Sequence, residues 1–235
     1  MNLKPFLKLF SVVLFVYALG CEAGAQTEKS SEFMEKETLK KGDYTLVYIN
    51  KDEKFSAETG QRLKDTFFEV YPGMVAAYNK NAATEVNFVI DPAYDGVAAT
   101  SNGSVVFNPR WFNRSPGDID VVTHEVMHII QDYGRTPGPW WVTEGIADYV
   151  RYKYGVDNEG AGWSLPDVKE DHKYDSSYRI TARFFVWIVQ NKNQNFVKEM
   201  DKIMRDHTYN KEVWVELTGK NPAALWKEYI ADPAI

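Results

Sequence analysis

The sequence has a single cysteine, Cys21, and it lies near the N-terminus. The chain after it therefore contains no disulfide, which excludes the class of secreted proteins that depend on disulfides for folding. Its stability must come from a hydrophobic core, from a bound metal, or from both. Hydrophobic residues make up 44% and aromatic residues 14% of the 235 residues, which suits one folded domain with a sizeable core.

Clusters of positive charge and long hydrophobic runs are also missing. The formal net charge of −6 is spread along the chain, and no basic cluster could follow a phosphate backbone. Nucleic acid is therefore not expected as a partner. An apolar run near the N-terminus, LFSVVLFVYAL, is too short for a helix that spans a membrane.

Residues 1–25 are predicted to be a signal peptide. Two lysines flank the start of the apolar run, and Ala23-Gly24-Ala25 supplies the small residues after which signal peptidases cut. A second interpretation uses Leu19-Gly20-Cys21, which is similar to the sequence at which bacteria attach lipid to a cysteine. We expect a secreted or periplasmic protein or, in the second interpretation, one anchored to the bacterial cell envelope by lipid at Cys21.

The remaining sequence predicts a single α+β domain over residues 43–235. Residues 26–42 are polar and charged, and we interpret them as a flexible lead-in or a loosely held helix. Strands come first, at residues 44–50, at residues 85–90 and in a hairpin (GVAATSNGSVVFN) around Asn102-Gly103, a turn sequence typical of hairpins. Helices follow, so we expect a small mixed sheet with helices and a helical C-terminal part.

Helices are expected where apolar residues repeat at helical spacing after a capping residue. Ser56 caps the first, which Pro72-Gly73 breaks or kinks. The next has Ser115 as its cap, Pro116 in its first position and Asp118 as part of a capping box. The expected helices cover residues 57–79 with that break, then Ser115 to Gly134, 140–154, 177–191, 196–206 and 222–230.

The segment VVTHEVMHIIQDYG holds two of the four histidines of the chain, His124 and His128, with Glu125 next to the first. On a helix both rings lie on one face and can bind one metal ion at about 2.0–2.1 Å. The carboxylate of Glu125 can then reach a water on that ion without binding the ion. The motif predicts one zinc ion that lowers the pKa of this water and a glutamate that accepts its proton. The alternative is a pair of ordinary helix histidines that are hydrogen-bonded inside the domain.

A catalytic zinc ion with two histidine ligands needs a third protein ligand and one open position. The segment WWVTEGIADY supplies two candidates, Glu144 and Asp148, one turn apart on a helix that can pack beside the first. We expect Glu144 to bind the metal and Asp148 to hydrogen-bond to His124 or His128. The reverse assignment of the two carboxylates stays open.

Three segments, HEVMHIIQDYG, PGPWWVTEGIADYVRYKYG and SYRITARFFVWI, resemble the plant basic secretory protein family, also described as peptidases of plants and bacteria. The resemblance covers about residues 44–230, and the family is similar to the gluzincin zinc metallopeptidases. It implies a zincin-like fold with His124, His128 and Glu144 as metal ligands. It also implies Glu125 as the base. The net negative charge departs from the basic plant members, but charge bears on partners and solubility rather than on fold.

Two further groups are expected to serve the substrate. Peptide hydrolysis passes through an oxyanion, for which Tyr178 is the candidate donor and His172 the second choice. A plain packing role for Tyr178 stays open. A strand in front of the motif can pair with an extended polypeptide, and either arm of the hairpin could serve. The substrate-binding residues are expected to be Gly96, Val97, Ala98 and Ala99.

The predicted function is that of an exported zinc-dependent peptidase, an endopeptidase that acts on polypeptides. One alternative is a secreted zinc-binding or defence-type domain of the same fold with little or no turnover. Another is a zinc hydrolase that acts on a non-peptide amide, such as a cell-wall cross-link. Glu125 favours catalysis over the first alternative, because a purely structural zinc ion needs no base.

Overall fold

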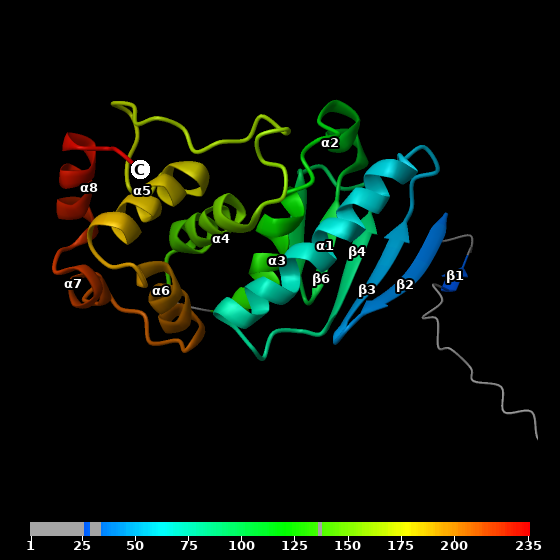
Figure 1. The fold of residues 1–235 in the computed structure, drawn as a ribbon, viewed down its shortest axis with the longest axis horizontal. Helices are drawn as coiled ribbons and strands as arrows, with labels where there is room; N and C mark the ends of the chain where they lie inside the picture. The colour runs from blue at the N-terminus through cyan, green and yellow to red at the C-terminus, as the bar shows by residue number, and fades with distance from the viewer. Residues whose placement is uncertain (1–25, 29–33, 136–137) are drawn as a thin grey trace, which may run out of the picture.

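The computed structural model describes residues 26–28, 34–135 and 138–235. The predicted signal peptide, residues 1–25 with Cys21, lies outside the described residues and stays a prediction. The described chain is mixed α+β, with the sheet at one end of the molecule and the C-terminal helices at the other (Figure 1). None of the described helices is both long and apolar enough to cross a membrane.

The sheet has six strands in the order β1-β2-β3-β4-β6-β5. β3 and β4 are parallel, as are β4 and β6, and the other neighbours are antiparallel. Asn102 and Gly103 both have positive φ, as a two-residue hairpin turn requires, so the predicted hairpin is confirmed. The strands are β1 (Gln26–Glu28), β2 (Glu35–Lys41), β3 (Tyr44–Asn50), β4 (Glu85–Ile90), β5 (Ala98–Ser101) and β6 (Ser104–Phe107).

Two helices, α1 and α3, pack against each other and against the sheet, α1 on β3 and α3 on β5 and β6. The fourth helix, α4, connects this layer to the C-terminal helices because it packs against both α3 and α5 (Figure 1). The helices are α1 (Ala57–Tyr78), α2 (Pro109–Arg114), α3 (Val121–Gln131), α4 (Trp140–Tyr154), α5 (Tyr178–Asn191), α6 (Phe196–Arg205), α7 (Val213–Thr218) and α8 (Pro222–Ala231).

The described parts of the polar segment 26–42, residues 26–28 and 34–42, are not the expected lead-in or loosely held helix. Every residue of β2 within it pairs with β3, and β1 pairs with β2 in turn. Glu37 also forms an ion pair with Lys64 of α1, with 2.6 Å between Oε2 and Nζ. Strand formation depends on the partner strand more than on composition, so the charged sequence alone pointed to the wrong structure.

The proline at position 72 does not break α1. Ser56 caps the helix through its side chain, as predicted, and the helix continues to Tyr78. Proline removes a helical hydrogen bond and costs about 3 kcal/mol in a helix interior. Tyr71 and Met74 on either side of it are fully buried, and the burial of this face outweighs that cost.

The helix that carries the histidine motif starts later than predicted. Ser115 ends a short helix, α2, which the sequence pattern did not indicate and which Asn108 caps. Asp118 is not part of a capping box, because its carboxylate accepts hydrogen bonds from Trp111 and Arg151. With both expected capping residues used elsewhere, α3 begins only at Val121.

The end of α3 also differs from the prediction. Asp132 adopts the left-handed conformation that ends the helix, two residues before Gly134, which also has positive φ. Within α3 every residue except His128 is buried. A helix that is buried all round must satisfy its polar side chains inside the protein, so partners are required for the histidines and for Glu125.

Candidate metal centre

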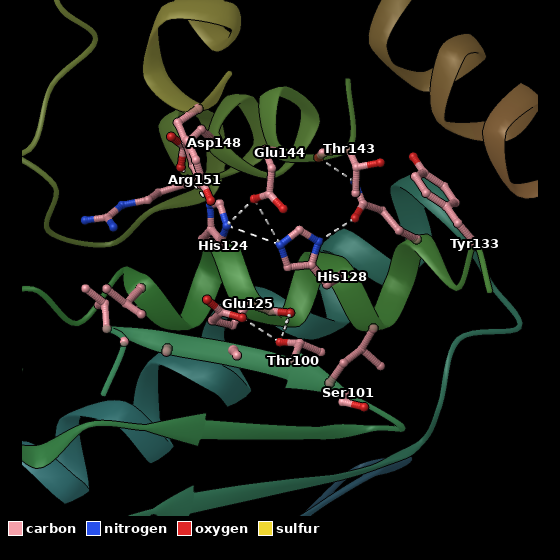
Figure 2. Close-up of a pocket in the computed structure, with 18 of the residues that line it drawn as sticks. Thr100, Ser101, His124, Glu125, His128, Tyr133, Thr143, Glu144, Asp148 and Arg151 are labelled. Carbon is pink, nitrogen blue, oxygen red and sulfur yellow. Dashed lines mark hydrogen bonds and ion pairs between the residues drawn. The ribbon is translucent and has the colours of Figure 1, made fainter. Parts of the chain in front are cut away.

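Contacts with two helices, α5 and α3, position the first turns of α4. Gly145 faces α5, where a Cβ atom would meet Cγ2 of Thr181 at 2.4 Å, so a side chain at this position would push the two helices apart. α4 also packs against α3. Glu144, next to this glycine, extends toward the two histidines of the motif (Figure 2).

Three atoms form a triangle: Nε2 of His124, Nε2 of His128 and Oε2 of Glu144. The two nitrogens are 3.2 Å apart, and they lie 3.2 and 3.5 Å from the glutamate oxygen. Ligands at about 2.0–2.1 Å from a tetrahedral ion are about 3.3 Å from one another. The triangle therefore has the size that a zinc ion requires, and its two imidazoles and one carboxylate are ligands that zinc accepts.

Asp148 contacts the opposite side of His124, with 2.7 Å between its Oδ1 and Nδ1 of the ring. A carboxylate can only accept here, so the ring carries a proton on Nδ1, and Nε2 is the atom that it presents to the triangle. The geometry favours Glu144 as the metal ligand and Asp148 as the hydrogen-bond partner of His124 over the reverse assignment.

His128 has a partner that the sequence analysis did not identify. Oε1 of Gln131 lies 2.7 Å from Nδ1 of His128, and Nε2 of Gln131 donates to the backbone oxygen of Thr143 at 2.9 Å. The only sequence signal was the spacing, because residues three apart lie on the same helix face. Glutamine is so common on helices that this spacing alone is not specific.

Glu125 extends from α3 toward the edge strand β5 (Figure 2). Its Oε2 accepts a hydrogen bond from Oγ1 of Thr100 at 2.7 Å, and the same hydroxyl lies 3.0 Å from the backbone oxygen of Glu125. The carboxylate is buried but borders the cavity above the triangle. Thr100 is one residue beyond the expected substrate-binding segment, and its side chain fixes the position of the Glu125 carboxylate.

Charges in the cluster favour a cation between the ligands. Burial lowers the pKa of His124, but the hydrogen bond and charge of Asp148, with Glu144 and Glu125, raise it to about 10. Burial raises the pKa of Glu144, but its hydrogen bonds with the two histidines lower it to about 2. The surroundings therefore stabilise positive charge at the imidazole of His124, and a divalent ion would displace the proton held there.

A cavity of about 1220 Å³ opens above the triangle, and all four expected substrate-binding residues, Gly96 to Ala99, line it. The strand begins only at Ala98, since the carbonyls of Gly96 and Val97 accept hydrogen bonds from Asn108. Alternate residues of an antiparallel strand face opposite edges. Ala98 and Thr100 therefore present their backbone groups at the free edge of β5, where the hydroxyl of Tyr94 donates to the oxygen of Ala98.

Tyr178 lies over the ring of His124, with 6.1 Å between centroids and 21° between planes, and lines the cavity. Partial burial, and then the charges of Glu144 and its neighbouring carboxylates, raise the pKa of the phenol, so it keeps its proton and can donate. Among the described residues, His172 does not line this cavity, and its ring accepts from a backbone N–H of its own loop. The structure brings Tyr178 to the site and leaves His172 outside it.

The two tryptophans at the start of α4 have different surroundings. Trp140 is 62% exposed and touches Tyr178 edge-on, with 6.1 Å between centroids. Trp141 stacks on Trp214 at 5.5 Å. Ser177 and Tyr178 both have positive φ, an unfavourable conformation that places the tyrosine at the mouth of the cavity. Trp140 and Tyr178 thus form an exposed aromatic pair beside the triangle, whereas Trp141 belongs to the core.

Comparisons with known proteins give one family and several similar solved structures. The model of the family described as peptidase of plants and bacteria matches residues 50–229, most of the chain. No curated protein matches the sequence. An M1 zinc metallopeptidase from Deinococcus radiodurans is 14% identical with a TM-score of 0.44, over 83% of this chain and 47% of that one. A two-domain M1 zinc metallopeptidase variant bound to L-tryptophan is 13% identical with a TM-score of 0.40, over 90% and 49%.

This chain therefore spans about half the length of both metallopeptidases. The family match, in contrast, includes the sheet from the end of β3, both helices of the triangle and nearly all of the C-terminal helices. By that match, the chain belongs to the family of peptidases of plants and bacteria.

Proposed function

We propose that this chain is an exported zinc-dependent endopeptidase. The observation that carries the proposal is the triangle of His124, His128 and Glu144 with the carboxylate of Glu125 beside it at the cavity. A zinc ion that only stabilised the fold would need a fourth protein ligand rather than a neighbouring base. Membership of a peptidase family supports polypeptides as the substrates.

The fold that we propose is zincin-like. It combines the helix of the histidine motif, α3, with a glutamate from a second helix, α4, and an edge strand, β5, beside the site. Residues 43–235 are proposed to form one domain together with β1 and β2, which belong to the same sheet.

A bound zinc ion supplies a Lewis acid that lowers the pKa of water and polarises the peptide carbonyl. Glu125 then accepts the proton of the attacking water, and its position is fixed by the hydroxyl of Thr100. The same carboxyl group can return that proton to the departing amine. Tyr178, with its phenol protonated, donates to the oxyanion that develops on the substrate.

The substrate pairs with the free edge of β5. Ala98 and Thr100 offer backbone groups there, which bind an extended chain whatever its side chains. Specificity must then come from side-chain pockets along the cavity. Extended loops and unfolded segments are the parts of a polypeptide that can reach such an edge.

The experiment that tests this function compares the wild type with Glu125→Gln. Zinc content is measured by atomic absorption, and cleavage is measured with casein and with a quenched fluorescent peptide. We expect both proteins to hold one zinc ion and only the wild type to cleave. Equal cleavage by both proteins would exclude Glu125 as the base, and a zinc-loaded wild type without cleavage would favour a binding protein of the same fold.

Export is tested separately by the mass of the mature N-terminus. Cleavage after Ala25 gives a chain that begins at Gln26, whereas lipid attachment gives a heavier chain that begins at Cys21. A mature protein that retains residues 1–25 without modification would contradict both forms of the proposal.

A further inference from the structure

We propose that Gln131 is a positioning residue that holds the proton of His128 on Nδ1 and couples His128 to Glu144 across two helices. This inference rests on the metal centre of the proposed function. Gln131 is the last residue of α3 and is only 1% exposed. Its amide group lies between Nδ1 of His128 and the backbone oxygen of Thr143.

The backbone of Thr143 determines which way the amide points. A carbonyl oxygen can only accept, so the atom 2.9 Å from it must be the amide nitrogen, Nε2 of Gln131. The amide oxygen is then the atom 2.7 Å from Nδ1 of His128. That oxygen carries no hydrogen, so the ring must donate from Nδ1. In a neutral imidazole the lone pair is then on Nε2, the atom that faces the triangle.

The two histidines obtain the same ring orientation from different chemistry. His124 donates to the charged carboxylate of Asp148, whereas His128 donates to a neutral amide. The amide adds no further negative charge to a cluster that already holds three carboxylates. It can also donate, which a carboxylate cannot, and it uses this to bind the residue before Glu144. Loss of Gln131 is therefore expected to disturb two of the three ligands.

The test measures zinc affinity by competition with a chelator of known affinity. Gln131→Met keeps the size of the side chain and removes its hydrogen bonds, and we expect zinc to bind about 10- to 100-fold more weakly. The matched control is Asn79→Leu, because Asn79 is also a buried amide that donates to a carbonyl of α3, Ile130, at 2.9 Å, but touches no ligand. We expect this control to lose a similar amount of thermal stability and to keep its zinc affinity.

Rescue by a conservative variant separates positioning from folding. Gln131→Glu keeps the acceptor for His128 and loses the donor to Thr143, so zinc affinity should fall by less than it does in Gln131→Met but stay below that of the wild type. Unchanged zinc affinity in Gln131→Met, or an equal loss in Asn79→Leu, would overturn the inference. If Gln131→Met does not fold, Gln131→Glu with the zinc affinity of the wild type has the same meaning, because this variant has lost the donor to Thr143.

Cleavage distinguishes this inference from the function on which it rests. A wild type that binds zinc in a Gln131-dependent manner but cleaves nothing supports the inference and contradicts the peptidase. A wild type that cleaves, with zinc affinity independent of Gln131, contradicts the inference alone. A wild type that binds no zinc overturns both.

Discussion

The candidate site has two halves, one on α3 and one on α4 and α5, and they differ in how deeply they are buried. The half on α3 is built into the core, where His124 and Glu125 are buried and α3 packs on two strands. The half on α4 and α5 is more open, since Trp140 is 62% and Tyr178 49% exposed, whereas the facing side chains of Glu144 and His128 are similarly exposed, at 21% and 18%. Only Glu144 crosses from the open half to the triangle. A bound metal would therefore stabilise the open half most.

The largest effect is expected from Glu144→Gln, which removes the only ligand from the open half. Zinc at a thousand times its dissociation constant stabilises a folded protein by about 4 kcal/mol. We expect the wild type to show such an increase and Glu144→Gln to lose nearly all of it, as measured by thermal unfolding with zinc and with EDTA.

Hydrogen exchange can show which half of the site zinc stabilises. Removal of zinc from the wild type should speed exchange in the first turns of α4 and leave α3 protected. Equal deprotection of both helices would show that the two halves are stabilised together, contrary to the comparison.

A smaller effect is expected from Asp148→Ala, which removes the carboxylate behind His124 and leaves all three ligands in place. Zinc affinity should fall about 10- to 100-fold, because the ring loses the acceptor that orients it. Asp148→Asn keeps an acceptor without the charge and should fall between the alanine variant and the wild type in chelator competition. An alanine variant with the zinc affinity of the wild type would contradict the role given to this carboxylate.

Thr100→Val tests the half of the site on α3, because Thr100 hydrogen-bonds to Glu125, and it leaves all three metal ligands in place. Valine has the shape of threonine but cannot donate to Glu125, and a hydrogen bond to a charged group contributes about 1.5–3 kcal/mol. We expect kcat to fall about tenfold or more, while KM and zinc content stay close to those of the wild type. Thr100→Ser retains the hydroxyl and should restore kcat. A fall in zinc content with kcat would instead indicate damage to the fold.

The parts of the fold that the sequence predicted are those in which local signals agree. α8 is an example, because Asn221 caps it at 2.9 Å from the backbone nitrogen of Ala224 and Pro222 occupies the first turn. The predicted start of α3 was wrong because a residue distant in the sequence uses the side chain that local signals assign to the cap. Asp118 suits a local cap, but Arg151, 33 residues later, takes its carboxylate. Contacts at such sequence separation leave no local pattern.

The same distinction holds within the site. His124, His128 and Glu125 follow from spacing on one helix, and the structure places them as that spacing predicts. Gln131 and Thr100 were not identified, because glutamine and threonine carry no specific chemistry until a neighbour gives them one. Their roles depend on how α4 and β5 pack beside α3, which is tertiary information.

The smallest effect is expected at the exposed aromatic pair of the open half. Trp140→Ala should raise KM for peptides with a large apolar residue about two- to tenfold, since an aromatic contact contributes about 0.5–1.5 kcal/mol. Its free energy of unfolding should change by less than about 0.5 kcal/mol, because the side chain is 62% exposed. Trp141→Ala is the matched control: it loses the stacking on Trp214 and should destabilise the fold by about 3 kcal/mol. The same KM for apolar and polar peptides in Trp140→Ala and the wild type would show that the pair does not select substrates, and the open half would then serve the metal alone.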